Sequence, residues 1–170
     1  MLRCRFWRWS ACCTGWKVEP VAAPPRKNVP GKRSWARRCA LQALYQWQLT
    51  DQEPRLIANQ FLADEDLGKA DPDYFRELLH QVPAQLAAID AALSPFLDRP
   101  MSQVDPVERA ILRIGGYELM QQPGTAYRII INEAVELAKI FGAEQGHRFV
   151  NGVLDKVARA VRPVEFATRS

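Results

Sequence analysis

Apolar residues recur every three or four positions along most of the chain from residue 33 onward, which is the spacing of one face of an α-helix. A first helix is predicted at about 34–49, a second at about 54–64 and a third at about 73–98. The first places five small or apolar side chains on one stripe: Ala36, Ala40, Ala43, Leu44 and Trp47. No convincing alternation of apolar and polar residues marks a strand. The pattern therefore predicts an all-α protein.

Proline, glycine and capping residues divide this pattern further. Pro83 is expected to kink or split the third segment. The sequence "DPVERAIL" has the signature of a helix start, with Asp105 as the cap. Gly142 is a natural terminator of the next helix, and the last one ends before Pro163. These signals predict about seven helices, with a division of the chain near 99–105.

Residues 1–31 differ from the rest, because they are rich in Trp, Arg, Cys and Pro and show no helical periodicity. Arg5 and Arg8 interrupt the apolar stretch that a secretory signal needs, whereas a basic transit peptide stays open as an alternative. We expect this segment to be a disordered or incorrectly annotated extension. The folded protein then comprises residues 32–162, followed by a polar tail, 163–170.

Charge is distributed unevenly along the chain. Residues 1–50 contain ten Lys or Arg and a single acid, Glu19, for a net charge of +9. Residues 51–170 contain 13 bases and 18 acids, for a net charge of −5. A basic arm on an acidic body is common in proteins that bind nucleic acids. Nowhere do 18 apolar residues follow one another, so a transmembrane helix is not expected.

The sequence offers no arrangement of reactive side chains that is typical of an enzyme. It has no glycine-rich phosphate loop, H-E-x-x-H motif or serine elbow. The four cysteines show no C-x-x-C spacing and lie far from His80 and His147, so a zinc site is not expected. Cys39 falls among alanines and is interpreted as a small buried hydrophobe. We predict a protein without catalytic activity, metal or other cofactor, in a reducing compartment such as the cytoplasm.

The start of the first helix is basic, although the helix dipole makes cations unfavourable there. Its cations are Lys32, Arg33, Arg37 and Arg38. Tyr45 lies two turns beyond Arg38 on almost the same line. Cations that contact phosphates beside a ring that stacks on a base are typical of single-stranded nucleic-acid binding. We expect Arg37 and Arg38 to point away from the alanine stripe, so that their replacement leaves the fold intact. A solvated basic helix is the alternative.

Three stretches together resemble the NusB family of transcription antitermination factors. They are "ARRCALQALYQWQL" (36–49), "DYFRELLHQVP" (73–83) and "INEAVELAKIFGAEQGHRFVNGVLDK" (131–156). The resemblance covers about residues 33–162 and implies two small helical bundles packed across one another, about 32–98 and 104–162. It also implies binding of the boxA segment of ribosomal RNA transcripts together with the ribosomal protein NusE. The resulting complex helps RNA polymerase to resist termination.

By position, the resemblance assigns RNA contacts to two segments. The first contains Lys32, Arg33, Arg37, Arg38 and Tyr45, and the second contains Gln145, His147, Arg148 and Phe149. Glu108 lies in the helix that the family presents to NusE. Ser34 and Trp35 interrupt an arginine run of the family, and Gln145 stands where an acid is frequent. The balance between the two RNA segments is therefore open.

Two other functions stay open. The same helical domain resembles the N-terminal part of ribosomal-RNA cytosine-5 methyltransferases, but those enzymes need a further α/β domain that has no counterpart in this sequence. The second is a protein-interaction module without catalysis, for which the basic arm would be incidental. A salt-dependent RNA titration separates this module from an RNA-binding factor.

Overall fold

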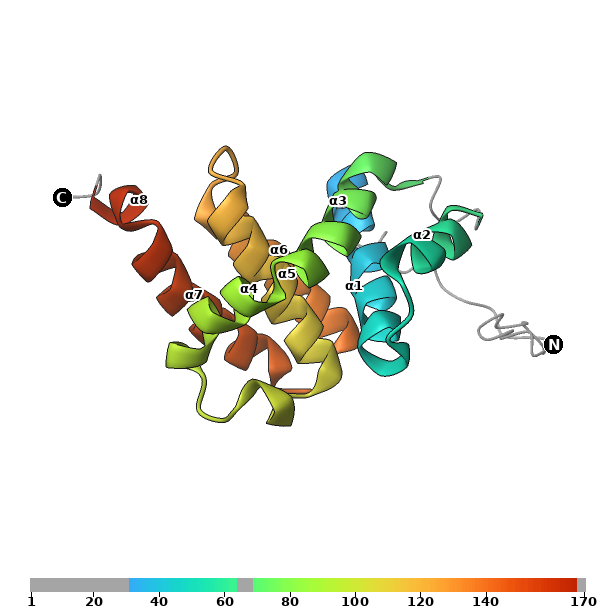
Figure 1. Cartoon of the computed structure of the whole chain (residues 1–170). Coiled ribbons are helices and arrows are strands. Elements are labelled where there is room, and N and C mark those ends of the chain that lie inside the picture. The colour runs from blue at the N-terminus through green and yellow to red at the C-terminus, as the bar shows by residue number, and fades with distance from the viewer. Residues whose placement is uncertain (1–30, 64–68, 168–170) are drawn as a thin grey trace, which may run out of the picture.

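The computed structural model describes residues 31–63 and 69–167, so the predicted extension lies outside it except for Gly31. Within these residues the chain forms eight α-helices, two short 3-10 helices and no strand, which confirms the predicted all-α class. The α-helices are α1 (Lys32–Thr50), α2 (Pro54–Leu62), α3 (Pro72–Ala84), α4 (Leu86–Leu93), α5 (Pro106–Gln121), α6 (Tyr127–Phe141), α7 (Gly146–Val161) and α8 (Pro163–Ala167). The 3-10 helices are η2 (Ser94–Phe96) and η3 (Met101–Gln103). Figure 1 shows α1, α2 and α3 at one end, α7 and α8 at the other, and α5 between them.

Most helix ends lie where the sequence signals predict them. The Asp105 carboxylate caps α5 by accepting a hydrogen bond from the backbone N–H of Val107 at 2.9 Å. Pro83 splits the third predicted segment: α3 ends one residue later and α4 begins at Leu86. Proline causes this break because it has no backbone N–H and crowds the preceding turn. Gly142 follows the last residue of α6 directly.

One hydrophobic cluster runs through the predicted division near 99–105. It includes the alanine stripe of α1, in which Ala36, Ala40 and Ala43 have no exposed surface. It continues through Phe75 of α3 and Leu154 of α7, which are also fully buried. Cys39 is buried in the same cluster, as predicted. In the described part of the chain, every helix is too short or too polar to cross a membrane.

Helix α5 is the central element of this core. It packs against α1, α3, α4, α6 and α7, and every residue from Ala110 to Leu119 is buried. A helix that is covered on all sides needs small residues where its neighbours come closest. At Gly115, a Cβ atom would lie 2.7 Å from Cδ1 of Leu154 on α7. At Gly116, it would lie 3.2 Å from Cγ2 of Ile89 on α4. The glycine pair therefore allows α4 and α7 to approach the axis of α5.

The C-terminal end of α5 is closed by a buried arginine. The Arg162 guanidinium donates hydrogen bonds to the carbonyl oxygens of Leu119 at 2.6 Å, Glu118 at 2.8 Å and Gln122 at 2.8 Å. The carbonyls of Glu118 and Gln122 also accept backbone hydrogen bonds, each at 3.0 Å, from Gln122 and Thr125. The carbonyl of Leu119 has no such donor, because Pro123, four residues further on, lacks a backbone N–H. The helix α8 lies in the segment 163–170, which the sequence analysis described as a polar tail. Glu165 of α8 forms an ion pair with Arg162 at 2.9 Å.

Opposite effects are expected at two helical glycines. Gly115→Val should lower the free energy of unfolding by about 1–3 kcal/mol, because the new side chain overlaps Leu154 in a packed core. Gly152→Ala, on the exposed side of α7, should raise it by up to about 1 kcal/mol through helix propensity, since no atom lies within 4 Å of the added Cβ. Urea unfolding of both variants measures the difference. Equal stabilities would show that α5 and α7 do not need the close approach.

Candidate nucleic-acid interface

Arg37 is buried, so the expectation that its side chain points away from the core is wrong. Only 4% of its surface is exposed. Its Nη2 lies 2.7 Å from Oε1 of Glu118, and its Nε donates a hydrogen bond to the same oxygen at 2.9 Å. Nη1 pairs with Oε2 of Glu133 at 3.3 Å. Arg37 is therefore an internal ion-pair partner and is unavailable to RNA phosphates.

The carboxylates around Arg37 connect four helices. Glu118 of α5, which is 1% exposed, also accepts a hydrogen bond from the Tyr74 hydroxyl of α3. Glu133 of α6 accepts one from the Ser34 hydroxyl of α1 at 2.9 Å. Burial raises the pKa of Glu118, and the Arg37 guanidinium acts in the opposite direction. The network fixes the rotation of α1 relative to α3, α5 and α6.

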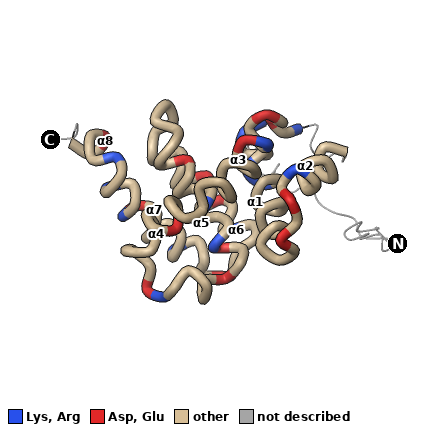
Figure 2. Tube along the Cα trace, viewed as in Figure 1, with Lys and Arg blue, Asp and Glu red and all other residues tan. Residues whose placement is uncertain are grey.

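The other cations of the basic segment remain near the surface. Lys32 and Arg33 are exposed and Arg38 is half-buried. Arg33 lies over the Tyr74 ring, 5.0 Å from its centre, whereas Arg38 lies 5.4 Å from the Trp35 ring. Because Arg33 and Arg38 are separated by five residues of an α-helix, their side chains point in directions about 140° apart around the axis of α1. The cations therefore face two sides of the helix instead of forming one row. Figure 2 shows acidic residues beside the basic residues near α3.

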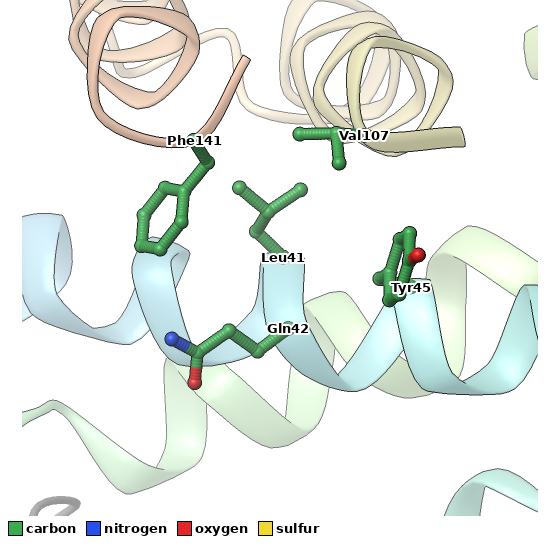
Figure 3. A pocket seen from close by; sticks show the side chains of 5 residues that line it. All are labelled: Leu41, Gln42, Tyr45, Val107 and Phe141. Carbon is green, nitrogen blue, oxygen red and sulfur yellow. The ribbon is translucent and has the colours of Figure 1, made fainter. Parts of the chain in front are cut away.

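Tyr45 lines an apolar hollow on the side of Arg38. The hollow has a volume of about 250 Å³ and is formed by Leu41, Gln42, Tyr45, Val107 and Phe141. Figure 3 shows that these side chains come from three elements and that the Tyr45 and Phe141 rings stand on opposite sides of Leu41. Tyr45 is 39% exposed. A ring that is anchored on one face and open on the other can stack on a nucleic-acid base.

The second predicted segment lies at the start of α7. Gln145 and Arg148 are exposed, and His147 and Phe149 are half-buried. Phe149 lines a second hollow, of about 210 Å³, with Gln145, Glu108 and Arg99. Each hollow includes one residue of the first turn of α5: Val107 lines that of Tyr45, and Glu108 lines that of Phe149. Tyr45 of the first segment and Gln145 and Phe149 of the second thus all lie beside the first turn of α5. Arg33, by contrast, faces Tyr74 on another side of α1.

Glu108, assigned to the protein partner, lies in the same hollow as Gln145 and Phe149. A Cβ atom at Gly146 would collide with its carboxylate, so a glycine here lets the carboxylate approach the start of α7. Burial, and secondly the Asp105 carboxylate, raise the pKa of Glu108. The predicted partner contact and the predicted RNA contacts are therefore neighbours on one surface.

Several residues of this surface escaped the sequence analysis. Phe141, Val107 and Gln42 line the hollow of Tyr45, and Arg99 lies 5.8 Å from the Phe149 ring. The only feature of the sequence that could have pointed to one of these residues is that Phe141 directly precedes the helix terminator Gly142. In residues 31–63 and 69–167, no three His, Cys, Asp or Glu side chains converge as a metal site requires.

The sequence matches the NusB family over residues 34–159. The chain belongs to this family. The transcription antitermination protein NusB of Nitrosococcus oceani is 55% identical over 142 residues, which cover 84% of this chain and 95% of that protein. Its counterpart from Alcanivorax borkumensis is 49% identical over 142 residues, with the same coverage. The resemblance found in the sequence is thus confirmed.

Solved structures of the NusB family have the same fold. NusB of T. maritima superposes with a TM-score of 0.69 at 27% identity and covers 79% of this chain and 96% of its own. A crystal structure of the antitermination factors NusB and NusE in complex with dsRNA matches with a TM-score of 0.65 at 25% identity. That match covers 75% of this chain and 96% of the other.

Arg37 is expected to contribute to stability. Arg37→Ala leaves Glu118 buried without its partner and should lower the free energy of unfolding by about 3–5 kcal/mol. Arg38→Ala, one residue away, should change it by less than about 0.5 kcal/mol. Replacing Arg37 and Glu118 together by Met should recover much of the loss, because no unpaired charge remains fully buried and the Glu133 carboxylate reaches the surface. Urea unfolding of the three variants checks this, and a fully stable Arg37→Ala protein would refute it.

Proposed function

We propose that this chain is an RNA-binding transcription antitermination factor that binds boxA RNA of ribosomal RNA operons together with NusE and promotes processive transcription. The observation that carries the proposal is the junction of α1, α5, α6 and α7. There, the rings of Tyr45 and Phe141 line one hollow, and the Phe149 ring lines a second hollow with Arg99. The cations Arg38 and Arg148 lie on the helices α1 and α7 that form these hollows. Membership of the NusB family and the likeness to a NusB–NusE–RNA complex support it.

The proposed RNA contacts divide into two kinds. Lys32, Arg33, Arg38 and Arg148 neutralise phosphates, which positions the strand without specifying its sequence. Tyr45 and Phe149 offer ring faces to bases, and Gln145 and His147 supply hydrogen-bonding groups beside them. Arg37 serves indirectly, because its ion pairs hold α1 in the rotation that opens the Tyr45 hollow.

The proposed mechanism is assembly without catalysis. RNA occupies the junction of the four helices, and NusE docks on the start of α5 around Glu108. Because Glu108 shares its hollow with Gln145 and Phe149, the two ligands would lie side by side. Each ligand then stabilises the surface that the other contacts, and the protein links RNA to the elongation complex.

Salt dependence of RNA binding tests the cationic contacts. Changing both Arg38 and Arg148 to Ala removes two phosphate contacts, so the slope of log affinity against log salt should flatten by about 1.4. BoxA-like and scrambled RNAs should be weakened by similar factors. Tyr45→Ala should instead cost about 1–3 kcal/mol of binding free energy with the slope nearly unchanged. Fluorescence titration of labelled RNA at several salt concentrations measures both.

Arg76→Ala is the matched control, because Arg76 is exposed on α3 and pairs with Asp73 away from the hollows. It should change neither slope nor affinity. If the Arg38/Arg148 variant stayed folded and bound RNA with an unchanged slope, the junction would not be the RNA site, and the chain would be better described as a protein-interaction module.

Glu108→Gln separates the partner from the RNA, because it keeps the shape of the side chain and removes its charge. We expect weaker binding to NusE through loss of a charge contact. RNA binding should be unchanged or stronger, since a carboxylate beside the proposed strand is lost. Calorimetric titration with each ligand gives the two affinities, and thermal unfolding controls for the fold. Unaltered NusE affinity in a folded variant would reject the role of Glu108.

A further inference from the structure

A polar hollow of about 440 Å³ lies between α6 and α7. The side chains that give it its chemistry are Tyr127, Arg128, Asn132, Asn151, Asp155 and Arg159. None of them was assigned a contact in the sequence analysis or in the proposed RNA junction, although Asn132, Asn151 and Asp155 lie in the stretch 131–156. Figure 2 shows basic residues on the part of α7 that leads to α8. Arg159 belongs to the last turn of α7.

Helix periodicity connects this hollow with the proposed RNA junction. On α7, Arg148, Asn151, Asp155 and Arg159 recur at three or four residues and so share one face. From Arg148 to Arg159 this face spans about 16 Å, at about 1.5 Å per residue. At Gly152, on the same face, no atom lies within 4 Å of an added Cβ, so a ligand backbone can approach the helix. Arg148 thus stands at one end of a continuous track and Arg159 at the other.

The two arginines of the hollow are held in place by aromatic rings. Arg159 lies 4.9 Å from the centre of the Phe166 ring, and Arg128 lies 5.6 Å from that of Tyr127. The Tyr127 and Phe166 rings contact each other, with centres 4.3 Å apart. Nε of Arg128 donates a hydrogen bond to the Tyr127 hydroxyl at 3.1 Å. Preorganised guanidinium groups lose less conformational freedom when they bind an anion.

The charge of the hollow favours a phosphate-bearing ligand. Its one carboxylate, Asp155, lies 3.0 Å from Nε of Arg159, which offsets its charge. With Arg128 included, the lining has an excess of one positive charge. Guanidinium groups bind phosphate with paired hydrogen bonds, and asparagine amides pair with base edges. Arginines beside two exposed carboxamides therefore suit a nucleotide better than an apolar peptide.

We propose that the hollow between α6 and α7 binds nucleotides of a single RNA strand that continues from the junction past Arg148. This inference rests on the proposed function, because it takes the same strand as its ligand. The junction binds the core of the strand, and the hollow binds its extension through Arg128 and Arg159. The hollow thereby lengthens the RNA site and adds contacts that depend weakly on sequence.

The test measures the affinity of the protein for a short RNA and for longer RNAs. It compares the wild-type protein with two variants, each of which has a different pair of arginines changed to Ala. One labelled RNA contains only a boxA-like core, and two longer ones extend it by a homopolymer at the 5′ or the 3′ end. Wild-type protein should bind one longer RNA more tightly than the core. Changing Arg128 and Arg159 to Ala should abolish this gain, flatten the salt slope for that RNA by about 1.4 and leave core binding unchanged.

Matched controls use exposed, ion-paired arginines elsewhere. Changing Arg55 of α2 and Arg76 of α3 to Ala removes the same charge and should preserve the gain from the extension. A second variant, Asn151→Asp, adds a carboxylate to the hollow and should reduce the gain without removing a ring contact. Thermal unfolding of each variant confirms the fold.

The outcomes distinguish this inference from the proposed function. If the core binds but neither extension increases affinity in the wild-type protein, the inference is overturned and the junction stands. If the core does not bind, the proposed function fails. If the Arg128/Arg159 variant loses NusE binding and keeps the full RNA gain, the hollow serves a protein and the inference is wrong.

Discussion

The buried ion pair between Arg37 and Glu118 is the contact on which the arrangement of the helices depends. A charge in a protein interior is costly unless a partner compensates it, so each residue requires the other at one position. Glu118 lies on the central helix α5, and Arg37 lies on α1. Their pairing at 2.7 Å therefore fixes how α1 is rotated against the rest of the core.

The rotation of α1 determines which of its residues reach the surface. With Arg37 turned inward beside the alanine stripe, Arg38 and Tyr45 lie on the opposite side of the helix, toward Phe141 and Val107. A rotation by one residue would bury Arg38 and expose Arg37. The apolar hollow that we propose for a base is thus a consequence of a charged contact in the core.

The same helix α5 organises the other end of the molecule. Its glycine pair, Gly115 and Gly116, allows α4 and α7 to approach the helix axis closely. The Arg162 guanidinium donates hydrogen bonds to carbonyl oxygens at the C-terminal end of α5, including that of Leu119. The position of α7 places Gln145 and Phe149 beside Glu108 at the start of α5, and α7 also forms the polar hollow with α6. A central helix that is buried on every side therefore links the proposed junction with the proposed track for RNA.

The sequence alone determined the helical class, most helix ends and the family. Helix periodicity, the Asp105 cap, the break at Pro83 and the terminator Gly142 are local properties, decided by residues within one or two turns. Family membership depends on residue identities, which the sequence also contains. The burial of the alanine stripe followed from the same local periodicity.

Only the tertiary structure decided the roles of the individual arginines. Arg37 and Arg38 are neighbours with the same chemistry, and a basic helix start gives no signal that one of them is buried. That outcome depends on Glu118 and Glu133, which are more than 80 residues away in sequence. The hollow of Tyr45 likewise needs Phe141 and Val107 from other helices. Long-range pairing of charges and surfaces is a property of the packed chain, and no local pattern encodes it.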